Sequence, residues 1–291
     1  MDFLLLKDKE PITIIGHKRA DADSLISCVL LSKLLTFKGV KNIIKFQDSY
    51  REDDFKYTKL DYSKIAEGVK SDDVLFLVDH SANYENEVVG CIEHHPILCK
   101  ELKGPNVLEK DTSSCAKFVY EIMLKEGMEE TEENVFLTVL SLYCDTLSFK
   151  LKAKTRGEDV LWAKEKIKEY SFDENYFYRA GLRTTNLNVP LNDIVKSKYK
   201  KIYLPNEKCY IGSSCVVAEI LPESDWLFKI IELTKKEVRE NKFEFWLSIF
   251  IELKSNKSFV VKTYKNGDFE ISYYDYIVSR GRNILTKYLK P

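Results

Sequence analysis

The chain has 291 residues, and its 45 lysines and arginines against 46 aspartates and glutamates give a net charge of −1. This balance excludes a general polycation of the kind that binds nucleic acid, and 44% hydrophobic with 31% charged residues is typical of a soluble globular protein. No stretch approaches the roughly 18 apolar residues of a membrane span, and the N-terminus lacks the features of a signal peptide. We expect a cytoplasmic protein of two domains.

Buried strands alternate with helices in the first half of the chain. The apolar stretches predict strands at 12–16, 42–46, 74–78 and 88–92. Helical spacing predicts helices at 22–38, 56–69, 114–126, 131–144 and 156–169. This alternation predicts an α/β domain with a doubly wound parallel sheet, whose ligands bind beyond the carboxyl ends of the strands.

The pattern changes after about Tyr170, where a polar, interrupted stretch runs to Pro190. Beyond it we expect a helix at 222–240 and strands at 200–204, 208–217, 245–253, 257–264 and 268–274. Asn266-Gly267 lies between the last two strands and is a hairpin signal. The predicted organisation is therefore a first domain at 1–175, a hinge linker at 176–190, and a smaller α+β domain at 191–291.

The seven cysteines form an odd set with no C-x-x-C pair, and several lie in apolar stretches. A disulfide framework or a thiolate zinc site would need paired or closely spaced cysteines. We therefore expect buried, reduced thiols.

All four histidines lie in short acidic motifs, three of which follow predicted strands. A fourth acidic motif, around Asp145, has no histidine. The carboxyl ends of parallel strands meet at one edge of a sheet, so the side chains should converge there. The candidate ligands are His17, Asp21, Asp23, Asp79, His94 and Asp145.

Four carboxylates and two imidazoles exceed the needs of one tetrahedral zinc but suit two metals that share a bridging carboxylate. Any one of these residues alone is commonly structural; the combination is what predicts a metal centre. Two ions roughly 3.5–4 Å apart can hold a hydroxide between them and stabilise an in-line displacement at phosphorus. Mixed imidazole and carboxylate ligation favours manganese, iron or cobalt over magnesium.

These motifs, together with Cys144–Lys150, resemble the four motifs of the DHH phosphoesterase superfamily. The resemblance is greatest to the manganese-dependent (family II) inorganic pyrophosphatases. Residues 278–282 are similar to the phosphate-gripping motif of that family's second, DHHA2-type domain. The resemblance implies a metal-binding phosphoesterase domain followed by a DHHA2-like domain that grips the substrate.

The resemblance also implies the roles of individual residues. One metal would be held by His17, Asp21 and Asp79, and the other by Asp23, Asp79, His94 and Asp145. The implied cofactors are two Mn²⁺ ions, with Co²⁺ or Mg²⁺ as alternatives and a further Mg²⁺ that could arrive with the substrate. His95 would donate to phosphate oxygen, and Arg280 would close over the leaving phosphoryl group. The implied reaction is hydrolysis of inorganic pyrophosphate to two phosphates by a metal-bridging hydroxide.

The chain departs from the family pattern at several positions. Glu93 stands where the motif begins with Asp, and the extra methylene should perturb the orientation of His94 rather than abolish metal binding. Arg19-Ala20 replaces the usual Asn-Pro, and Gly281 replaces a phosphate-binding lysine. Lys150, Arg183 and Arg282 are the candidates for substrate contact. The two arginines could supply the missing charge from shifted positions, or they could be ordinary solvated side chains.

These departures leave alternatives open. One is an exopolyphosphatase-like or small-nucleotide phosphoesterase of the same family, and another is a catalytically weak scaffold protein. A nucleic-acid exonuclease is disfavoured, because the 17 tyrosines and 16 phenylalanines lie mostly in apolar periodic stretches and form no basic-aromatic stripe. The expected partner is a small phosphate substrate, pyrophosphate or short polyphosphate, with neither nucleic acid nor membrane. A homodimer through the N-terminal domain is left open.

Overall fold

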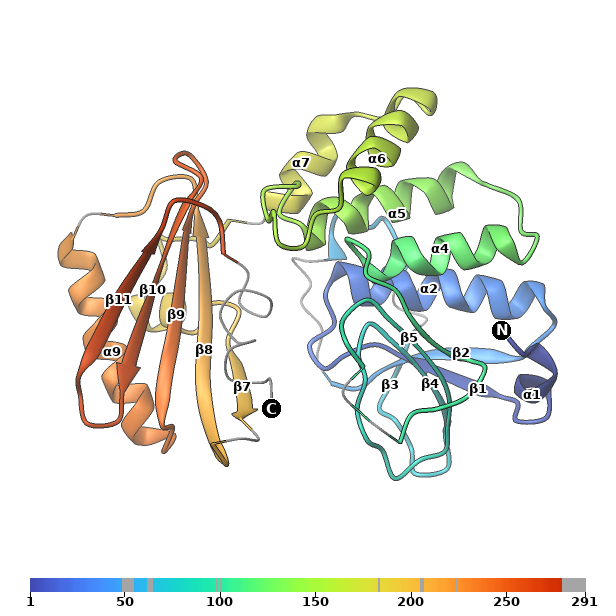
Figure 1. Ribbon diagram of the computed structural model, residues 1–291, viewed down its shortest axis with the longest axis horizontal. Coiled ribbons are helices and arrows are strands. Elements are labelled where there is room, and N and C mark those ends of the chain that lie inside the picture. Colours follow the sequence, from blue (N-terminus) through green and yellow to red (C-terminus); the bar gives the residue numbers. More distant parts are fainter. Residues whose placement is uncertain are drawn as a thin grey trace. The chain divides into compact units, whose positions relative to one another are not determined.

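The computed structural model describes residues 1–48, 55–61, 65–97, 99, 101–182, 184–204, 207–222 and 224–278. These residues form two compact units (Figure 1). The first contains residues 1–149 and 155–182, and the second contains residues 150–154 and the described chain from 184 onward. The first part of the predicted linker at 176–190 is helical, since residues 176–182 belong to α7 (Glu174–Leu182), which packs against α5 (Glu132–Asp145) in the first unit.

The first unit contains a six-stranded, all-parallel sheet in the order β3-β2-β1-β4-β5-β6. Its strands are β1 (Ile12–Ile15), β2 (Asn42–Phe46), β3 (Ala66–Glu67), β4 (Val74–Val78), β5 (Val88–Glu93) and β6 (Val107–Glu109). The prediction of an α/β fold with a parallel sheet is confirmed. The strand order reverses between β1 and β4, which is the position where open α/β sheets bind their ligands.

Two helices, α2 (Ala22–Phe37) and α4 (Cys115–Lys125), pack directly on one face of this sheet. The other helices of the unit are α1 (Phe3–Lys7), α5 (Glu132–Asp145), α6 (Gly157–Glu169) and α7, of which α6 and α7 contact α5. Figure 1 shows α2 and α4 lying along the strands, with α5 packed against both helices. The side chains of Asp21, Ser114 and Thr131 cap the N-termini of α2, α4 and α5 by accepting backbone N–H groups.

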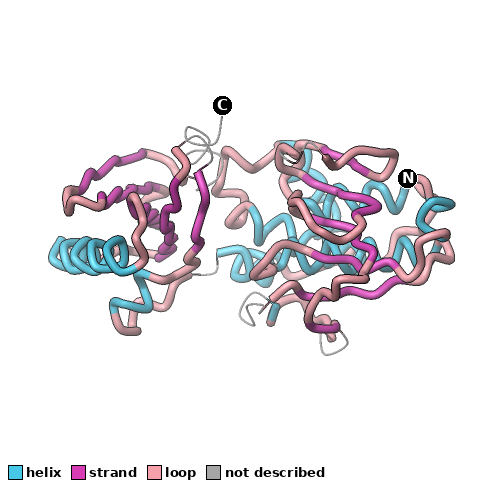
Figure 2. The backbone as a smooth tube through the Cα atoms, turned by 90° about the horizontal axis from the view of Figure 1, so that it is seen from below, coloured by secondary structure: helices cyan, strands magenta, loops and turns pink. Residues whose placement is uncertain are grey.

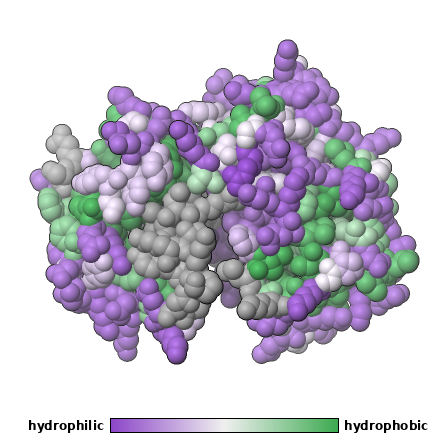
Figure 3. All heavy atoms as spheres, in the orientation of Figure 1, coloured by the Kyte–Doolittle hydropathy of each residue, from purple (hydrophilic) through white to green (hydrophobic). Residues whose placement is uncertain are grey.

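The two faces of the sheet are covered differently. Ile14 and Phe76 belong to the large core that includes the helices. Ile15 and Leu77 point to the opposite face, where the described residues that cover them include loop residues such as Tyr84. The double winding that we predicted therefore applies to the strand order, whereas loops rather than helices cover the second face within the described part of the chain. Hydrophobic side chains gather over these strands in Figure 3.

The helix predicted at 56–69 is wrong. Residues 56–58 form a turn, and Ala66–Glu67 form β3, which pairs with β2. The hydroxyl of Thr58 donates to Phe55 O at 2.8 Å and accepts Leu60 N–H at 3.2 Å. Lys59 has a φ of 57°, outside the helical region. A hydroxyl that bonds the local backbone competes with helix formation, and here it ends the turn.

The second unit contains a five-stranded mixed sheet in the order β11-β10-β9-β8-β7. Its elements are α8 (Leu191–Val195), β7 (Lys200–Leu204), β8 (Cys209–Ala218), α9 (Ser224–Glu240), β9 (Phe245–Glu252), β10 (Lys257–Tyr264) and β11 (Phe269–Tyr274). Only β8 and β9 are parallel, and α9 provides the crossover that such a pair requires (Figure 2). The Asn266-Gly267 turn joins β10 to β11, as predicted.

All seven cysteines are free thiols, and four of them are buried. The prediction of free thiols is confirmed, whereas the prediction that they are buried fails for the partly exposed Cys99, Cys209 and Cys215. No helix in the described part of the chain is both long enough and apolar enough to cross a membrane.

Candidate metal centre

The carboxyl ends of three neighbouring strands bring the predicted ligands together. His17 follows β1, Asp79 follows β4, and His94 follows β5. These strands are adjacent and in parallel register, with Ile15 opposite Leu77 and Val78 opposite Ile92. All six predicted ligands belong to groups whose donor atoms lie within 4.8 Å of one another.

The first group consists of His17, Asp21 and Asp79. His17 Nε2 lies 3.7 Å from Asp21 Oδ2 and 3.6 Å from Asp79 Oδ2. The other ring nitrogen, Nδ1, donates to Lys18 O at 2.7 Å, which leaves the lone pair of Nε2 facing the carboxylates.

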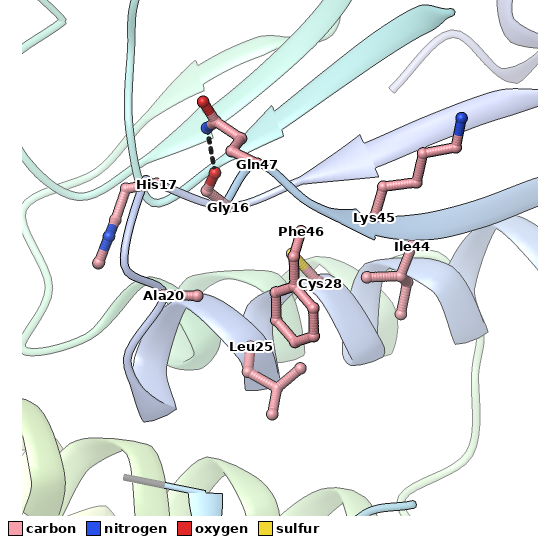
Figure 4. A pocket seen from close by; sticks show the side chains of 9 residues that line it. All are labelled: Gly16, His17, Ala20, Leu25, Cys28, Ile44, Lys45, Phe46 and Gln47. Carbon is pink, nitrogen blue, oxygen red and sulfur yellow. Dashed lines mark hydrogen bonds between the residues drawn. The ribbon is translucent and has the colours of Figure 1, made fainter. Parts of the chain in front are cut away.

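The loop that carries His17 is closed tightly against α2. His17 N–H donates to Ser24 Oγ at 3.1 Å, and Asp21 caps the helix by accepting Ser24 N–H at 3.2 Å. A Cβ at Gly16 would lie 1.9 Å from Ser24 Oγ, so this position requires glycine. Figure 4 shows the side chain of His17 projecting from this loop at the edge of a small cavity.

The second group consists of Asp23, His94 and Asp145. His94 Nε2 lies 3.7 Å from Asp23 Oδ2 and 3.7 Å from Asp145 Oδ2. His94 Nδ1 donates to Thr112 O at 3.2 Å, so in this group too the Nε2 lone pair faces the carboxylates.

Asp79 lies between the two groups. Its Oδ2 faces His17 Nε2, while its Oδ1 lies 3.2 Å from His94 Nε2. The backbone of Asp79 has a φ of 58°, a left-handed conformation that aspartate tolerates better than most residues. Burial, together with the negative charge of Asp23, raises the pKa of Asp79 well above its ordinary value. A cation placed among these groups would offset both effects.

The donor set fits a divalent metal. His94 Nε2 is buried and makes no hydrogen bond within the described structure, although three carboxylate oxygens lie 3.2–3.7 Å away. A neutral imidazole Nε2 and a carboxylate oxygen are both acceptors, so they cannot satisfy one another. A buried polar atom without a partner is rare in a stable protein unless an ion or water completes its environment.

Asp23 is held by groups that sequence analysis did not single out. Its Oδ2 accepts Cys115 N–H, and its Oδ1 accepts Ala116 N–H, each at 2.9 Å. Ser141 Oγ also donates to Oδ1, at 2.6 Å. The first turn of α4 thus serves as an anion site for a buried carboxylate. The only sequence signal was the N-cap Ser114, which predicts where the helix begins and not what its N–H groups bind.

His95 is the more exposed of the two adjacent histidines, and Glu93 holds it. Glu93 Oε1 lies 3.2 Å from His95 Nδ1, and Oε2 accepts His94 N–H at 2.9 Å. Burial raises the pKa of Glu93, but the hydrogen bond from His95, the charges of His95 and His94, and the hydrogen bond from His94 N–H together outweigh it, so that this pKa lies below its ordinary value. The Glu93 carboxylate therefore contacts the ring of His95 and the backbone of His94, whereas Thr112 O orients the ring of His94.

His80 belongs to a set of hydrogen bonds that connects the ends of β1, β2 and β4 beside the candidate ligands. Its Nδ1 donates to Val78 O at 3.1 Å, and its Nε2 lies 3.2 Å from Gln47 Nε2 and 2.9 Å from Tyr84 OH. Gln47 in turn donates to Gly16 O (Figure 4). Burial lowers the pKa of His80 to about 4, so the ring is neutral. His80 follows Asp79 directly in one of the acidic motifs, but the sequence alone assigns it no role.

Four cationic side chains are predicted to contact the substrate. Lys150 belongs to the second unit, where its Nζ donates to Asn256 Oδ1 at 2.9 Å. Arg183, Arg280 and Arg282 lie outside the described residues. Their roles, like that of Lys150, stay predictions.

Residues 11–144 match the model of the DHH family, N-terminal domain. This chain contains a DHH-family domain. All the candidate ligands except Asp145 lie inside the matched residues, and Asp145 follows them directly. The match therefore covers the parallel sheet, α2, α4 and nearly all of α5.

Curated relatives match most of the length of this chain. The chain is 25% identical over 273 residues to a Clostridium acetobutylicum protein named "Probable manganese-dependent inorganic pyrophosphatase", covering 88% of this chain and 86% of that protein. A Bacillus cereus protein of the same name is 24% identical over 267 residues, covering 86% and 84% of the two chains.

Solved structures share the fold. A Methanococcus jannaschii protein described as a "putative family II inorganic pyrophosphatase" superposes with a TM-score of 0.75 at 16% identity, covering 94% of this chain and 97% of that one. An exopolyphosphatase-related protein from Bacteroides fragilis gives a TM-score of 0.53 at 14% identity, covering 90% and 82%. At these identities the likeness concerns the fold alone.

Proposed function

We propose that this DHH protein is a binuclear-metal phosphoanhydride hydrolase whose first substrate is inorganic pyrophosphate. The observation that carries the proposal is the position of Asp79, which presents one carboxylate oxygen to His17 and the other to His94. A shared carboxylate between two imidazole-containing groups is what a pair of neighbouring metal ions requires. The names of the curated relatives support manganese and pyrophosphate as the first metal and substrate to test.

The proposed ligand sets follow the two groups. His17, Asp21 and Asp79 would hold one ion. Asp23, Asp79, His94 and Asp145 would hold the other. Mixed imidazole and carboxylate donors suit Mn²⁺ or Co²⁺ better than Mg²⁺, which prefers oxygen ligands and retained water. Two Mn²⁺ ions per chain are therefore the proposed resident cofactors, and a further Mg²⁺ could accompany the substrate.

Two such ions, when bound, supply a nucleophilic water at neutral pH and neutralise charge that develops at phosphorus. The side chains of the chain itself perform the remaining tasks. Buried Asp79 and Asp23 place negative charge where the cations are needed. His95, oriented by Glu93 through Nδ1, would present Nε2 to a phosphate oxygen. Arg280, with Arg282, Arg183 and Lys150, would contribute the cationic charge that a tetra-anionic substrate needs.

The experiment is phosphate release from pyrophosphate with Mn²⁺, compared with Mg²⁺ and with tripolyphosphate as substrate. We expect manganese-dependent turnover of pyrophosphate that exceeds turnover of tripolyphosphate. Turnover of tripolyphosphate or of a dinucleotide with only background release from pyrophosphate would contradict the proposed substrate and favour the exopolyphosphatase-like or nucleotide-cleaving alternative. No turnover on any of these substrates would contradict the enzyme assignment.

A further inference from the structure

The N-terminus of α6 is capped by a different segment of the chain. Its own N-cap residue, Arg156, makes no side-chain cap. Instead, Arg156 N–H donates to Ser113 Oγ at 2.8 Å, and Ser113 N–H donates to Asp159 Oδ2 at 2.9 Å. Asp159 is the third residue of the helix, where the acidic residue of a capping box normally bonds to its own N-cap N–H. Here the capping box is shared between α6 and the segment 111–116.

This shared capping box is buried. Asp159 is 2% exposed and Ser113 is fully buried. Arg156 also places Nη2 at 2.5–2.6 Å from both oxygens of Asp111, at the edge of the same contact. A buried N–H group requires an acceptor. Because Asp159 is the acceptor for Ser113 N–H, the conformation of the segment around Ser113 depends on α6.

The segment 111–116 contacts two of the proposed metal ligands. On one side of Ser113, Thr112 O accepts the Nδ1–H of His94. On the other side, Cys115 N–H and Ala116 N–H donate to the two oxygens of Asp23. A shift of Ser113 would therefore disturb the orientation of both ligands at once. Partners of this kind set the tautomer and the direction of a ligand without touching the metal.

We propose that Asp159 is a positioning residue for the metal centre. Through Ser113, it holds Thr112 O against His94 and the first N–H groups of α4 against Asp23. Asp159 itself contacts neither metal nor substrate. The proposal rests on the proposed function, because it takes His94 and Asp23 as ligands.

The test measures Mn²⁺ affinity and stoichiometry of the full chain by isothermal titration calorimetry. Asp159→Ala removes the acceptor for Ser113 N–H and is expected to weaken Mn²⁺ binding by about 10-fold or more. Asp159→Asn keeps a side-chain oxygen that can accept this N–H, so its affinity should stay within about threefold of wild type. In the metal-free protein, amide hydrogen exchange of residues 113–116 should become faster in Asp159→Ala only.

Glu130→Gln is the matched control. Glu130 accepts hydrogen bonds from Lys166 on α6 and from Tyr120 on α4, but it has no described contact with residues 111–116. This variant should lower stability and leave Mn²⁺ affinity unchanged. If Asp159→Ala does not fold, Asp159→Leu takes its place, since it also removes the acceptor for Ser113 N–H while its similar volume fills the buried site, and it should weaken Mn²⁺ binding by about 10-fold or more.

The outcomes separate the two proposals. Wild-type affinity in Asp159→Ala, or in Asp159→Leu where that variant replaces it, would show that the shared capping box serves stability alone and would overturn this inference. An equal loss of affinity in Glu130→Gln would also overturn it, because general destabilisation would then explain the effect. Wild-type protein that binds no Mn²⁺ would overturn the proposed function together with the inference.

Discussion

The two units of this protein use their sheets in different ways. In the first unit every strand is parallel, so all carboxyl ends lie at one edge, and His17, Asp79 and His94 follow three adjacent strands there. In the second unit only β8 and β9 are parallel, so the carboxyl ends of every other pair of neighbouring strands fall at opposite edges. A parallel sheet brings side chains that are distant in sequence together at one edge. In a mixed sheet, side chains that act together must come from the connecting segments instead.

The largest expected effect comes from Asp79, which lies between the two groups of candidate metal ligands. Asp79→Asn should lower Mn²⁺ affinity by more than about 100-fold, because loss of a shared ligand should exceed the 10–100-fold effect of losing a partner that only orients a ligand. Asp73→Asn is the matched control, since Asp73 and Asp79 flank the same strand and Asp73 pairs with Lys45 instead. Calorimetric titration with Mn²⁺ measures both. Equal affinities in the two variants would contradict the assignment of Asp79 as a shared ligand.

A smaller effect is expected from the second unit. Lys150→Ala should raise the KM for pyrophosphate by up to about 10-fold while Mn²⁺ affinity stays unchanged, because the residue would contact substrate and not metal. The exposed neighbour Lys152→Ala serves as the control for a change in surface charge. Steady-state kinetics at saturating Mn²⁺ measure the effect. A KM equal to that of Lys152→Ala would remove Lys150 from the substrate site.

The smallest functional effect is expected from Glu130 and the side chains that donate hydrogen bonds to it. They lie in the same unit as the two groups of candidate metal ligands, but they contribute to packing. Burial raises the pKa of Glu130, yet hydrogen bonds from Lys166, Tyr120 and Tyr170 outweigh it, so this pKa lies below the ordinary value of 4.5. A lowered folded-state pKa stabilises the protein above the ordinary value, and that stability is lost as the pH falls through the folded-state value. Glu130→Gln should therefore lower the free energy of unfolding by about 1 kcal/mol at pH 7, since the site is only partly buried.

Urea unfolding of wild type and Glu130→Gln at pH 7 and at successively lower pH measures this contribution. The difference between the two should shrink as the pH falls below 4.5, because wild-type Glu130 then becomes protonated. Turnover at pH 7 should be unchanged. A difference in unfolding free energy that stays constant down to low pH would show that the ion pair with Lys166 does not contribute.

Several features were available from the sequence because they depend on neighbouring residues. Short apolar stretches bounded by polar residues located β1, β2, β4 and β5, and the motifs near their ends supplied the candidate ligands. The spacing of His17 and Asp21 around a helix start, with Asp21 as N-cap, is also a local property. The helix predicted at 56–69 failed on a local detail, the hydroxyl of Thr58, that periodicity does not register.

The sequence by itself determined which residue types would meet at the sheet edge, because strand ends carry them and a parallel sheet aligns strand ends. Only the tertiary structure decided how they are held. Asp23 meets Cys115 N–H across 92 residues, and Ser113 meets Asp159 across 46. Glu93 turned out to orient His95, and Asp79 to offer one oxygen to each group. These contacts depend on the packing of α4 and α6 and on the pairing of strands, which bring together groups that no local spacing relates.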